Sequence, residues 1–266
     1  MVKSLSHYRR RVTEKGVRGI ISSRFDLWRL NLTINNRTVG RAIELAGNRV
    51  RMDGLTYSVD SPRIPTAHKC TIAFGYHEPE ERLLVKRWLP SNVPLLELGG
   101  GLGTVACLAN KKLSDPVRHV VVEADPELIP LLERNRDLNY CKFTIVNKAL
   151  AYDCDHVELS LHPGFVCSNI FGSGERTSRV QATTISDLLN EAGFSEAGII
   201  CDIEGGESHM IKRELPRLRG RIKFLLLELH AEILGECAIG ELLQIVSDLG
   251  FVLKQRTGKN VFLAAC

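Results

Sequence analysis

The sequence lacks the long apolar runs, paired cysteines and clustered aromatic residues that define several classes of protein. No apolar stretch of the 266 residues approaches the roughly 18 residues that cross a bilayer. The basic start, residues 1–16, is not followed by an apolar segment, so it does not resemble a secretory signal. None of the eight cysteines forms a Cys-x-x-Cys pair. This argues against zinc ribbons and disulfide scaffolds and favours reduced thiols in the cytoplasm.

The composition is that of a globular protein, with 44% hydrophobic and 25% charged residues, but the charge is uneven. Residues 1–63 contain 13 Lys and Arg against 5 Asp and Glu, whereas the rest of the chain contains 22 against 26. A basic front end could contact an anionic membrane surface, a larger complex or a phosphorylated substrate, or it could be a solvated face. Nucleic acid is not expected, because no aromatic residues alternate with the basic ones to stack bases.

The hydrophobic pattern predicts two regions, an N-terminal extension over residues 1–75 and a larger domain over residues 76–266. In the extension, Asp53-Gly54 lies between two alternating segments and predicts a hairpin. In the larger domain, helical segments alternate with continuous apolar strands at residues 93–98, 119–124, 143–150, 198–203 and 223–230. This alternation predicts an α/β fold with a doubly wound, mostly parallel sheet. The last segment, residues 251–265, predicts an antiparallel hairpin.

A glycine-rich turn follows the first of these strands. Gly99, Gly101 and Gly103 allow a tight turn and the close approach of a ligand, and Glu123 ends the next strand 22 residues after Gly101. The spacing suits either a dinucleotide or S-adenosylmethionine (SAM), whose ribose hydroxyls a carboxylate can bind. Glu97, on the strand itself, would repel a pyrophosphate and favours the cationic SAM.

Five motifs in order resemble the FkbM family of SAM-dependent methyltransferases. They are LELGGGLG (96–103), VEADPELIPLLERNRDLN (122–139), TTISDLL (183–189), CDIEGGE (201–207) and LLLELH (225–230). The resemblance implies a seven-stranded, Rossmann-like class I methyltransferase that methylates hydroxyls of sugars, polyketides or related products. Cys201 stands where the family has lysine, so the role of that lysine does not transfer to this chain.

The resemblance also implies the residues that hold SAM. The glycine turn and Glu123 would lie along the donor, Tyr76 precedes the first core helix, and Lys148 and Ala149 follow the third strand, where adenine would lie. The expected cofactor-binding residues are Glu97, Gly99, Gly101, Gly103, Glu123, Ala124, Lys148, Ala149, Asp202 and Tyr76. The polar segment 163–179 could order over the donor or form a surface loop.

The acidic segment CDIEGGE predicts the catalytic groups. Side chains two apart on a strand share a face, so Asp202 and Glu204 should point together, as should Glu228 and His230 on the neighbouring strand. We expect His230, with a pKa near 6.5, to be the general base, and an adjacent acid to fix its tautomer. We expect Glu207 to cap the following helix.

A second version places a divalent metal, Mg²⁺ or Mn²⁺, between Asp202, Glu228 and His230, where it would orient the acceptor hydroxyl and lower its pKa. With either version, the sequence indicates a cytoplasmic SAM-dependent O-methyltransferase that acts on a small-molecule or glycoside hydroxyl. Two alternatives stay open. One is an NAD(P)-dependent oxidoreductase, and the other is a non-catalytic binding module of a biosynthetic complex.

Overall fold

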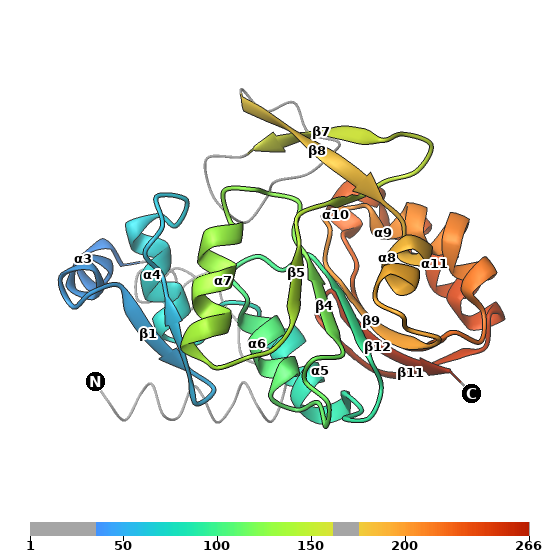
Figure 1. Cartoon of the computed structure of the whole chain (residues 1–266), viewed down its shortest axis with the longest axis horizontal. Helices are drawn as coiled ribbons and strands as arrows, with labels where there is room; N and C mark the ends of the chain where they lie inside the picture. The colour runs from blue at the N-terminus through green and yellow to red at the C-terminus, as the bar shows by residue number, and fades with distance from the viewer. Residues whose placement is uncertain (1–35, 162–175, 266) are drawn as a thin grey trace.

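The computed structural model describes residues 36–161 and 176–265 (Figure 1). The first described segment consists of α3 (Arg37–Leu45), β1 (Arg49–Met52), β2 (Leu55–Ser58) and α4 (Thr66–Ala73). β1 and β2 pair antiparallel, and Asp53 and Gly54 between them both have positive φ, at 55° and 81°. A two-residue turn with positive φ at both positions twists in the same sense as the two strands that it joins. The predicted hairpin is therefore confirmed.

The main sheet has seven strands in the order β11-β12-β10-β9-β3-β4-β5. Its strands are β3 (Leu95–Leu98), β4 (His119–Val122), β5 (Thr144–Val146), β9 (Ala197–Cys201), β10 (Ile222–Glu228), β11 (Phe251–Thr257) and β12 (Asn260–Ala265). β12 runs antiparallel to both of its neighbours, and the other pairs are parallel. The predicted doubly wound, mostly parallel sheet with a C-terminal hairpin is confirmed.

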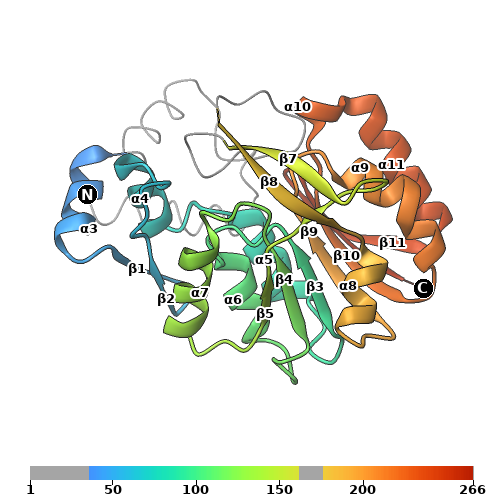
Figure 2. The same cartoon turned by 45° about the horizontal axis from the view of Figure 1, so that its top comes forward.

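Helices cover both faces of this sheet, as Figures 1 and 2 show. One layer consists of α5 (Pro79–Trp88), α6 (Thr104–Asn110) and α7 (Ile129–Leu138). The other side carries α8 (Ile185–Glu191), α9 (Glu207–His209), a π-helical turn (Met210–Glu214), a 3-10 turn (Leu215–Leu218), α10 (Ala231–Leu234) and α11 (Glu236–Asp248). Successive residues of β9 point to opposite faces of the sheet. Ile199 belongs to the same core cluster as Leu188 and Leu242, whereas Ile200 belongs to the core beneath α5 and α6.

A second, three-stranded sheet has the order β6-β8-β7, from β6 (Ala149–Leu150), β7 (His156–Leu161) and β8 (Arg176–Thr183). β7 and β8 form an antiparallel arm at the top of Figure 1. The sequence predicted one strand over residues 143–150, but the structure divides this segment between the two sheets. Asn147 lies at the division, and its amide donates to the carbonyls of Glu123 and Ala124.

The hairpin of the N-terminal extension packs on α7 through two asparagines. Asn135 Oδ1 accepts a hydrogen bond from the Ser58 backbone at 2.6 Å, and Asn139 Oδ1 accepts one from Thr56 at 3.0 Å. Apolar residues of the hairpin share one core with α6 and α7. The two asparagines of the FkbM-like second motif therefore hold this hairpin against the sheet domain.

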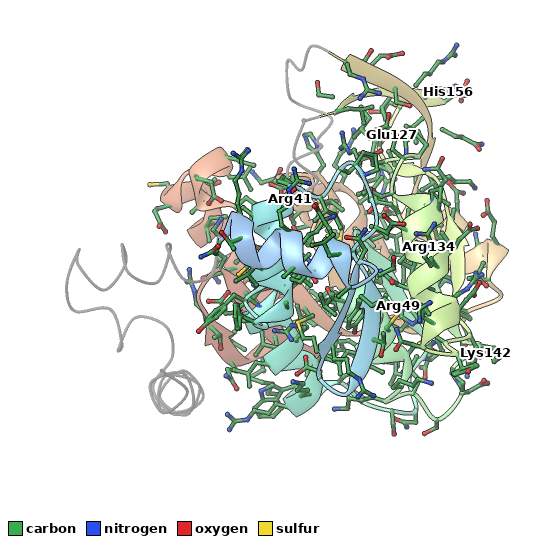
Figure 3. The ribbon with its side chains drawn as sticks, turned by 90° about the vertical axis from the view of Figure 1, so that its left-hand side faces the viewer. Arg41, Arg49, Glu127, Arg134, Lys142 and His156 are labelled. Carbon is green, nitrogen blue, oxygen red and sulfur yellow. The ribbon has the colours of Figure 1, made fainter. Side chains whose placement is uncertain are left out.

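Some basic residues of the described extension share one face of the molecule with basic residues of the larger domain. Figure 3 shows Arg41 on α3, Arg49 on β1, Arg134 on α7 and Lys142 on this side, and all four are exposed. The rest of the predicted basic segment, residues 1–35, lies outside the described residues, as does most of the predicted lid, residues 162–175. Over the described part of the chain, no helix is both long and apolar enough to cross a membrane.

Candidate functional site

A cavity of about 360 Å³ lies at the carboxyl ends of the central strands. Its wall includes residues that end or follow β3, β4, β9 and β10, and the strand order reverses at β3, which lies between β4 and β9. Ligands of open α/β sheets bind at such a reversal point. The wall contains these predicted residues: Tyr76, Gly99, Gly101, Glu123, Ala124, Lys148, Ala149, Asp202 and Glu228. Glu97, Gly103 and His230 are not part of it.

The three glycines of the turn serve different purposes. Gly99 has φ +94°, and a Cβ there would lie 1.9 Å from the carbonyl oxygen of Asp202, so only glycine lets these two strand ends meet. Gly103 has φ +83° and packs on Leu132, which a Cβ would approach to 2.7 Å. Gly101 faces open space on the cavity wall. Gly103 is therefore a packing residue, and the ligand-facing turn consists of Gly99 and Gly101.

Glu123 is held in a fixed orientation at the edge of the cavity. Its two carboxylate oxygens accept hydrogen bonds from the backbone N–H of Gly101 and of Asp125, each at 2.7 Å. Burial nevertheless raises the pKa of Glu123 to about 7, against the opposing effect of these bonds. Each oxygen keeps a lone pair for a further donor, so the carboxylate can still bind hydroxyls of a ligand.

The predicted role of Glu97 is wrong. Its side chain is 1% exposed and lies 3.3 Å from Nε2 of the fully buried His119. The Asn110 amide lies 3.3 Å from Nδ1 of the same ring, so Nε2 carries the proton that points at Glu97. Burial, with the nearby charge of Glu78, raises the pKa of Glu97 well above its usual value. A buried acid that is not part of the cavity wall has no direct contact with which to discriminate between the two cofactors.

The choice between SAM and a dinucleotide therefore depends on the charge of the cavity wall. Among the described wall residues, six are acids and one is a lysine: Glu78, Glu80, Glu123, Asp202, Glu204, Glu228 and Lys148. The Lys148 ammonium lies 2.9 Å from Glu191, which offsets its charge. Such a wall repels a pyrophosphate and attracts a cation.

Two acids of α5 and its start were not assigned a role by any motif. Glu78 directly precedes α5, but its side chain makes no cap hydrogen bond and its carboxylate binds the Thr104 hydroxyl instead. Its φ of 47° turns the chain into α5. Glu81 is 2% exposed, and burial and then the charge of Asp202 raise its pKa well above the usual value. Only the packing of α5 against the sheet brings Glu81 to the cluster.

The acids and histidine of the two strand ends converge, but strand alternation is not the reason. β9 ends at Cys201, so Asp202 and Glu204 lie in the turn that follows, where Glu204 has φ 51°. His230 Nε2 lies 3.5 Å from Asp202 Oδ1, 3.4 Å from Glu204 Oε2 and 3.9 Å from Glu228 Oε1. The sequence predicted the grouping correctly, and the left-handed turn at Glu204 produces it.

His230 differs from the expected neutral base in two respects. It is 3% exposed and lies behind the acids of the cavity wall. Burial lowers its pKa, but the hydrogen bond to Glu207 and the charges of Glu207, Asp202 and Glu204 outweigh that effect and raise the pKa to about 9. In this arrangement the imidazole is protonated at neutral pH, so the expected pKa near 6.5 is wrong.

Glu207 does not cap the following helix as predicted. It is fully buried, and its Oε1 lies 3.0 Å from His230 Nδ1 and accepts the Ile203 backbone N–H at 3.1 Å. The side chain makes no cap hydrogen bond to α9. Glu207 is thus the acid that orients the imidazole. Cys201, by contrast, is fully buried, and burial raises the pKa of its thiol, as expected of a small apolar residue.

Two overlapping groups of side chains in the described part of the chain have the spacing of metal ligands. In each, the ligand atoms lie within 4.8 Å of one another, and Asp202 belongs to both. One group adds Glu204 and His230, and the other adds Glu81 and Glu228. The predicted set of Asp202, Glu228 and His230 is therefore divided between the two.

Comparisons with known proteins add similarities of fold. No model of a protein family matches the sequence, and the search of curated proteins gave no match. Among solved structures, the human methyltransferase 10 domain containing protein is 15% identical with a TM-score of 0.44, over 86% of this chain and 95% of that one. M. jannaschii TYW2 in complex with AdoMet is 12% identical with a TM-score of 0.42, over 81% and 82%.

A third solved structure, Aeropyrum pernix fibrillarin in complex with natively bound S-adenosyl-L-methionine, is 11% identical with a TM-score of 0.42, over 70% of this chain and 73% of that one. The strand order itself, with an antiparallel last strand inserted between β10 and β11, defines the fold of this chain. It is the Rossmann-like, seven-stranded fold of class I methyltransferases.

Proposed function

We propose that this protein is a SAM-dependent O-methyltransferase that acts on a hydroxyl of a sugar or natural product. The observation that carries the proposal is the acidic wall of the cavity beyond β3 and β4, which suits a ligand with a sulfonium and an ammonium group. The five FkbM-like motifs support the same assignment, and we propose a relationship to that family. The proposal includes the cytoplasmic location that we expect from the sequence.

The residues present fit SAM, which supplies a methyl group on a positively charged sulfur. Glu123 would accept hydrogen bonds from the ribose hydroxyls, since both of its oxygens are oriented by backbone N–H groups. Gly99 and Gly101 allow the donor to lie against the backbone, and Ala149 would contact the adenine. Asp202 belongs to both parts of the wall, because its backbone contacts Gly99 and its carboxylate is a member of the acid cluster.

The acids of the wall are the groups that can reach the acceptor. Bound SAM would supply the methyl group, with the electron pair of its C–S bond left on sulfur, and the hydroxyl proton of the acceptor would pass to a carboxylate of the wall. Asp202, Glu204 and Glu228 face the cavity, and burial raises the pKa of each, which makes them stronger bases. His230, held by Glu207 behind them, is a positioning residue.

A thermal-shift measurement tests the donor. Saturating S-adenosylhomocysteine should raise the melting temperature by about 5–10 °C, whereas NAD(P) should leave it unchanged, because only a bound ligand stabilises the folded state. Stabilisation by NAD(P) alone would show that the protein is an oxidoreductase of the same sheet type.

A screen with labelled SAM tests the acceptor. Glycosides and nucleotide sugars come first, and mass spectrometry places the methyl group. Asp202→Asn should lower kcat by about 100-fold or more, the usual contribution of a positioned proton acceptor, and Glu228→Gln should also lower it. Glu133→Gln, which changes an exposed acid of α7, is the control. If both wall variants keep full activity, the assignment of the acid cluster fails.

A further inference from the structure

We propose that Glu81, Asp202, Glu228 and the amide oxygen of Asn260 bind a hard divalent cation, Mg²⁺ or Mn²⁺, at the acid side of the cavity. Carboxylates from three separate elements lie close together, and Asn260 faces one of them from a fourth element. Glu81 comes from α5, Asp202 follows β9, and Glu228 and Asn260 face each other across β10 and β12. The site differs from the set that the sequence predicted, because it contains no histidine.

The spacing of the carboxylates fits a single ion. One oxygen from each of Glu81, Asp202 and Glu228 lies within 4.8 Å of the others. Ligands of Mg²⁺ lie about 2.1 Å and those of Ca²⁺ about 2.3–2.6 Å from the metal, so opposite ligands are roughly 4–5 Å apart. Three acids at this distance repel one another strongly unless a cation lies between them.

Glu81 points to a ligand independently of that spacing. Its side chain is 2% exposed. In the described part of the chain, the charges that act on its carboxylate belong to other acids, Asp202, Glu78, Glu228 and Glu97. Burying a carboxylate without a partner is costly, and nearly all buried polar groups in folded proteins are satisfied. A cation bound between the three acids would provide the missing partner.

Asn260 provides a second independent observation. It is 2% exposed, it lies on the cavity wall, and its NH₂ group donates to Glu228 Oε2 at 3.4 Å. The amide oxygen is thereby left as the free atom, and it is buried without a hydrogen-bond partner in the described part of the chain. Asp202 Oδ1 also makes no hydrogen bond in the described part of the chain, although it lies 3.5 Å from His230 Nε2. An unpaired amide oxygen beside carboxylates is a ligand type that Mg²⁺ and Ca²⁺ accept.

The choice between the two overlapping groups follows from ligand type. The group with Glu204 and His230 contains an imidazole that is already bound to Glu207 through Nδ1. The group with Glu81 offers oxygen ligands only, which Mg²⁺ and Mn²⁺ prefer. Its ion would lie beside the acceptor hydroxyl, and Glu204 would then be the wall carboxylate left to take the proton. That role rests on the proposed methyl transfer, whereas the cation site itself does not.

Titration of Mn²⁺ alone into the full-length protein, followed by the loss of the free-ion signal in electron paramagnetic resonance, tests the site without SAM. The wild type should bind one ion with a Kd of about 10⁻⁶–10⁻³ M, the range of oxygen-ligand sites. Glu81→Gln should bind at least about tenfold more weakly, since even outer-shell substitutions cost about 10–100-fold. Mg²⁺ should displace the bound Mn²⁺.

Matched variants distinguish this site from its neighbour. Glu204→Gln and His230→Gln should weaken Mn²⁺ binding less than Glu81→Gln does, because neither side chain is a direct ligand of the proposed site. Glu133→Gln on exposed α7 should keep it unchanged. If Glu81→Gln is not folded by circular dichroism, Glu228→Gln takes its place.

Absence of Mn²⁺ binding to the wild type would overturn the proposal. So would a loss of affinity in Glu204→Gln with retention in Glu81→Gln, which would assign the ion to the histidine-containing group. If Mn²⁺ binds as expected but S-adenosylhomocysteine does not stabilise the protein, the cation site stands and the proposed function fails.

Discussion

Glu207 Oε1 lies 3.0 Å from His230 Nδ1, and both side chains are buried. The same oxygen accepts the Ile203 N–H, so one carboxylate joins the turn after β9 to the residue that follows β10. The pair therefore determines both the position of the imidazole and its proton.

Replacing Glu207 by glutamine should lower the pKa of His230 from about 9 by at least about one unit, because the buried negative charge is lost. A raised histidine pKa stabilises the folded state fully below the unfolded value of about 6.5, and this contribution is lost as the pH rises through about 9. Its size is roughly 3 kcal/mol for a shift of this extent. NMR titration of the imidazole, with urea unfolding at both ends of this pH range, measures both effects. An unchanged pKa in Glu207→Gln would contradict the pairing.

Glu97→Gln should change little. The acid is buried against His119 and its pKa is raised well above the usual value, so an amide of the same shape should cost less than about 1 kcal/mol of stability. The affinity for S-adenosylhomocysteine, measured by calorimetry, should stay within about threefold of the wild type, well under the tenfold that 1.4 kcal/mol represents. A tenfold loss would instead restore the role that the sequence predicted for this residue.

Glu123→Gln should weaken S-adenosylhomocysteine. Glutamine keeps one acceptor oxygen in place of two, so the backbone bonds from Gly101 and Asp125 can no longer both be made. Loss of charge-assisted bonds costs about 1.5–3 kcal/mol, which corresponds to roughly 10–100-fold in affinity. Calorimetric titration measures the change, and Glu133→Gln is the matched control. An affinity equal to that of the wild type would place the donor elsewhere.

Gly99→Ala tests the contact between two strand ends. The added Cβ would meet the Asp202 carbonyl oxygen at 1.9 Å, whereas Gly250→Ala introduces a methyl group at the same φ of +94° with nothing within 4 Å. Gly250→Ala should cost about 1–2 kcal/mol from backbone strain alone. Gly99→Ala should cost at least about 2 kcal/mol more, because backbone must move. Urea unfolding compares the two, and equal losses would show that no clash occurs.

The main sheet could be predicted because strands buried on both faces are continuous apolar segments such as Val120–Val122 and Leu225–Leu227. The second sheet could not. β6 has only two residues, which is too short for a hydrophobic pattern to show. For the same reason the division of residues 143–150 between two sheets was not predicted.

The sequence predicted which residues form the candidate site better than it predicted what each of them does. The motifs identified Asp202, Glu228 and His230, since each follows or ends an apolar strand. The orientation of Glu97 and the approach of Glu81 from α5 depend on tertiary packing, which no local pattern records. Likewise, the pKa of His230 depends on how many carboxylates surround it in space, and the sequence shows only that acids are near it in the chain.

The contact of Gly99 with the Asp202 carbonyl leaves no room for a methyl group between the glycine turn and the acid-bearing turn. The glycine turn and the acid-bearing turn therefore form one rigid block. The distance between a donor bound at the first turn and an ion or acceptor bound at the second is determined by the backbone. Adaptation to a different acceptor would have to come from other parts of the wall, such as residues 76–80, where side chains can be exchanged without shifting that block.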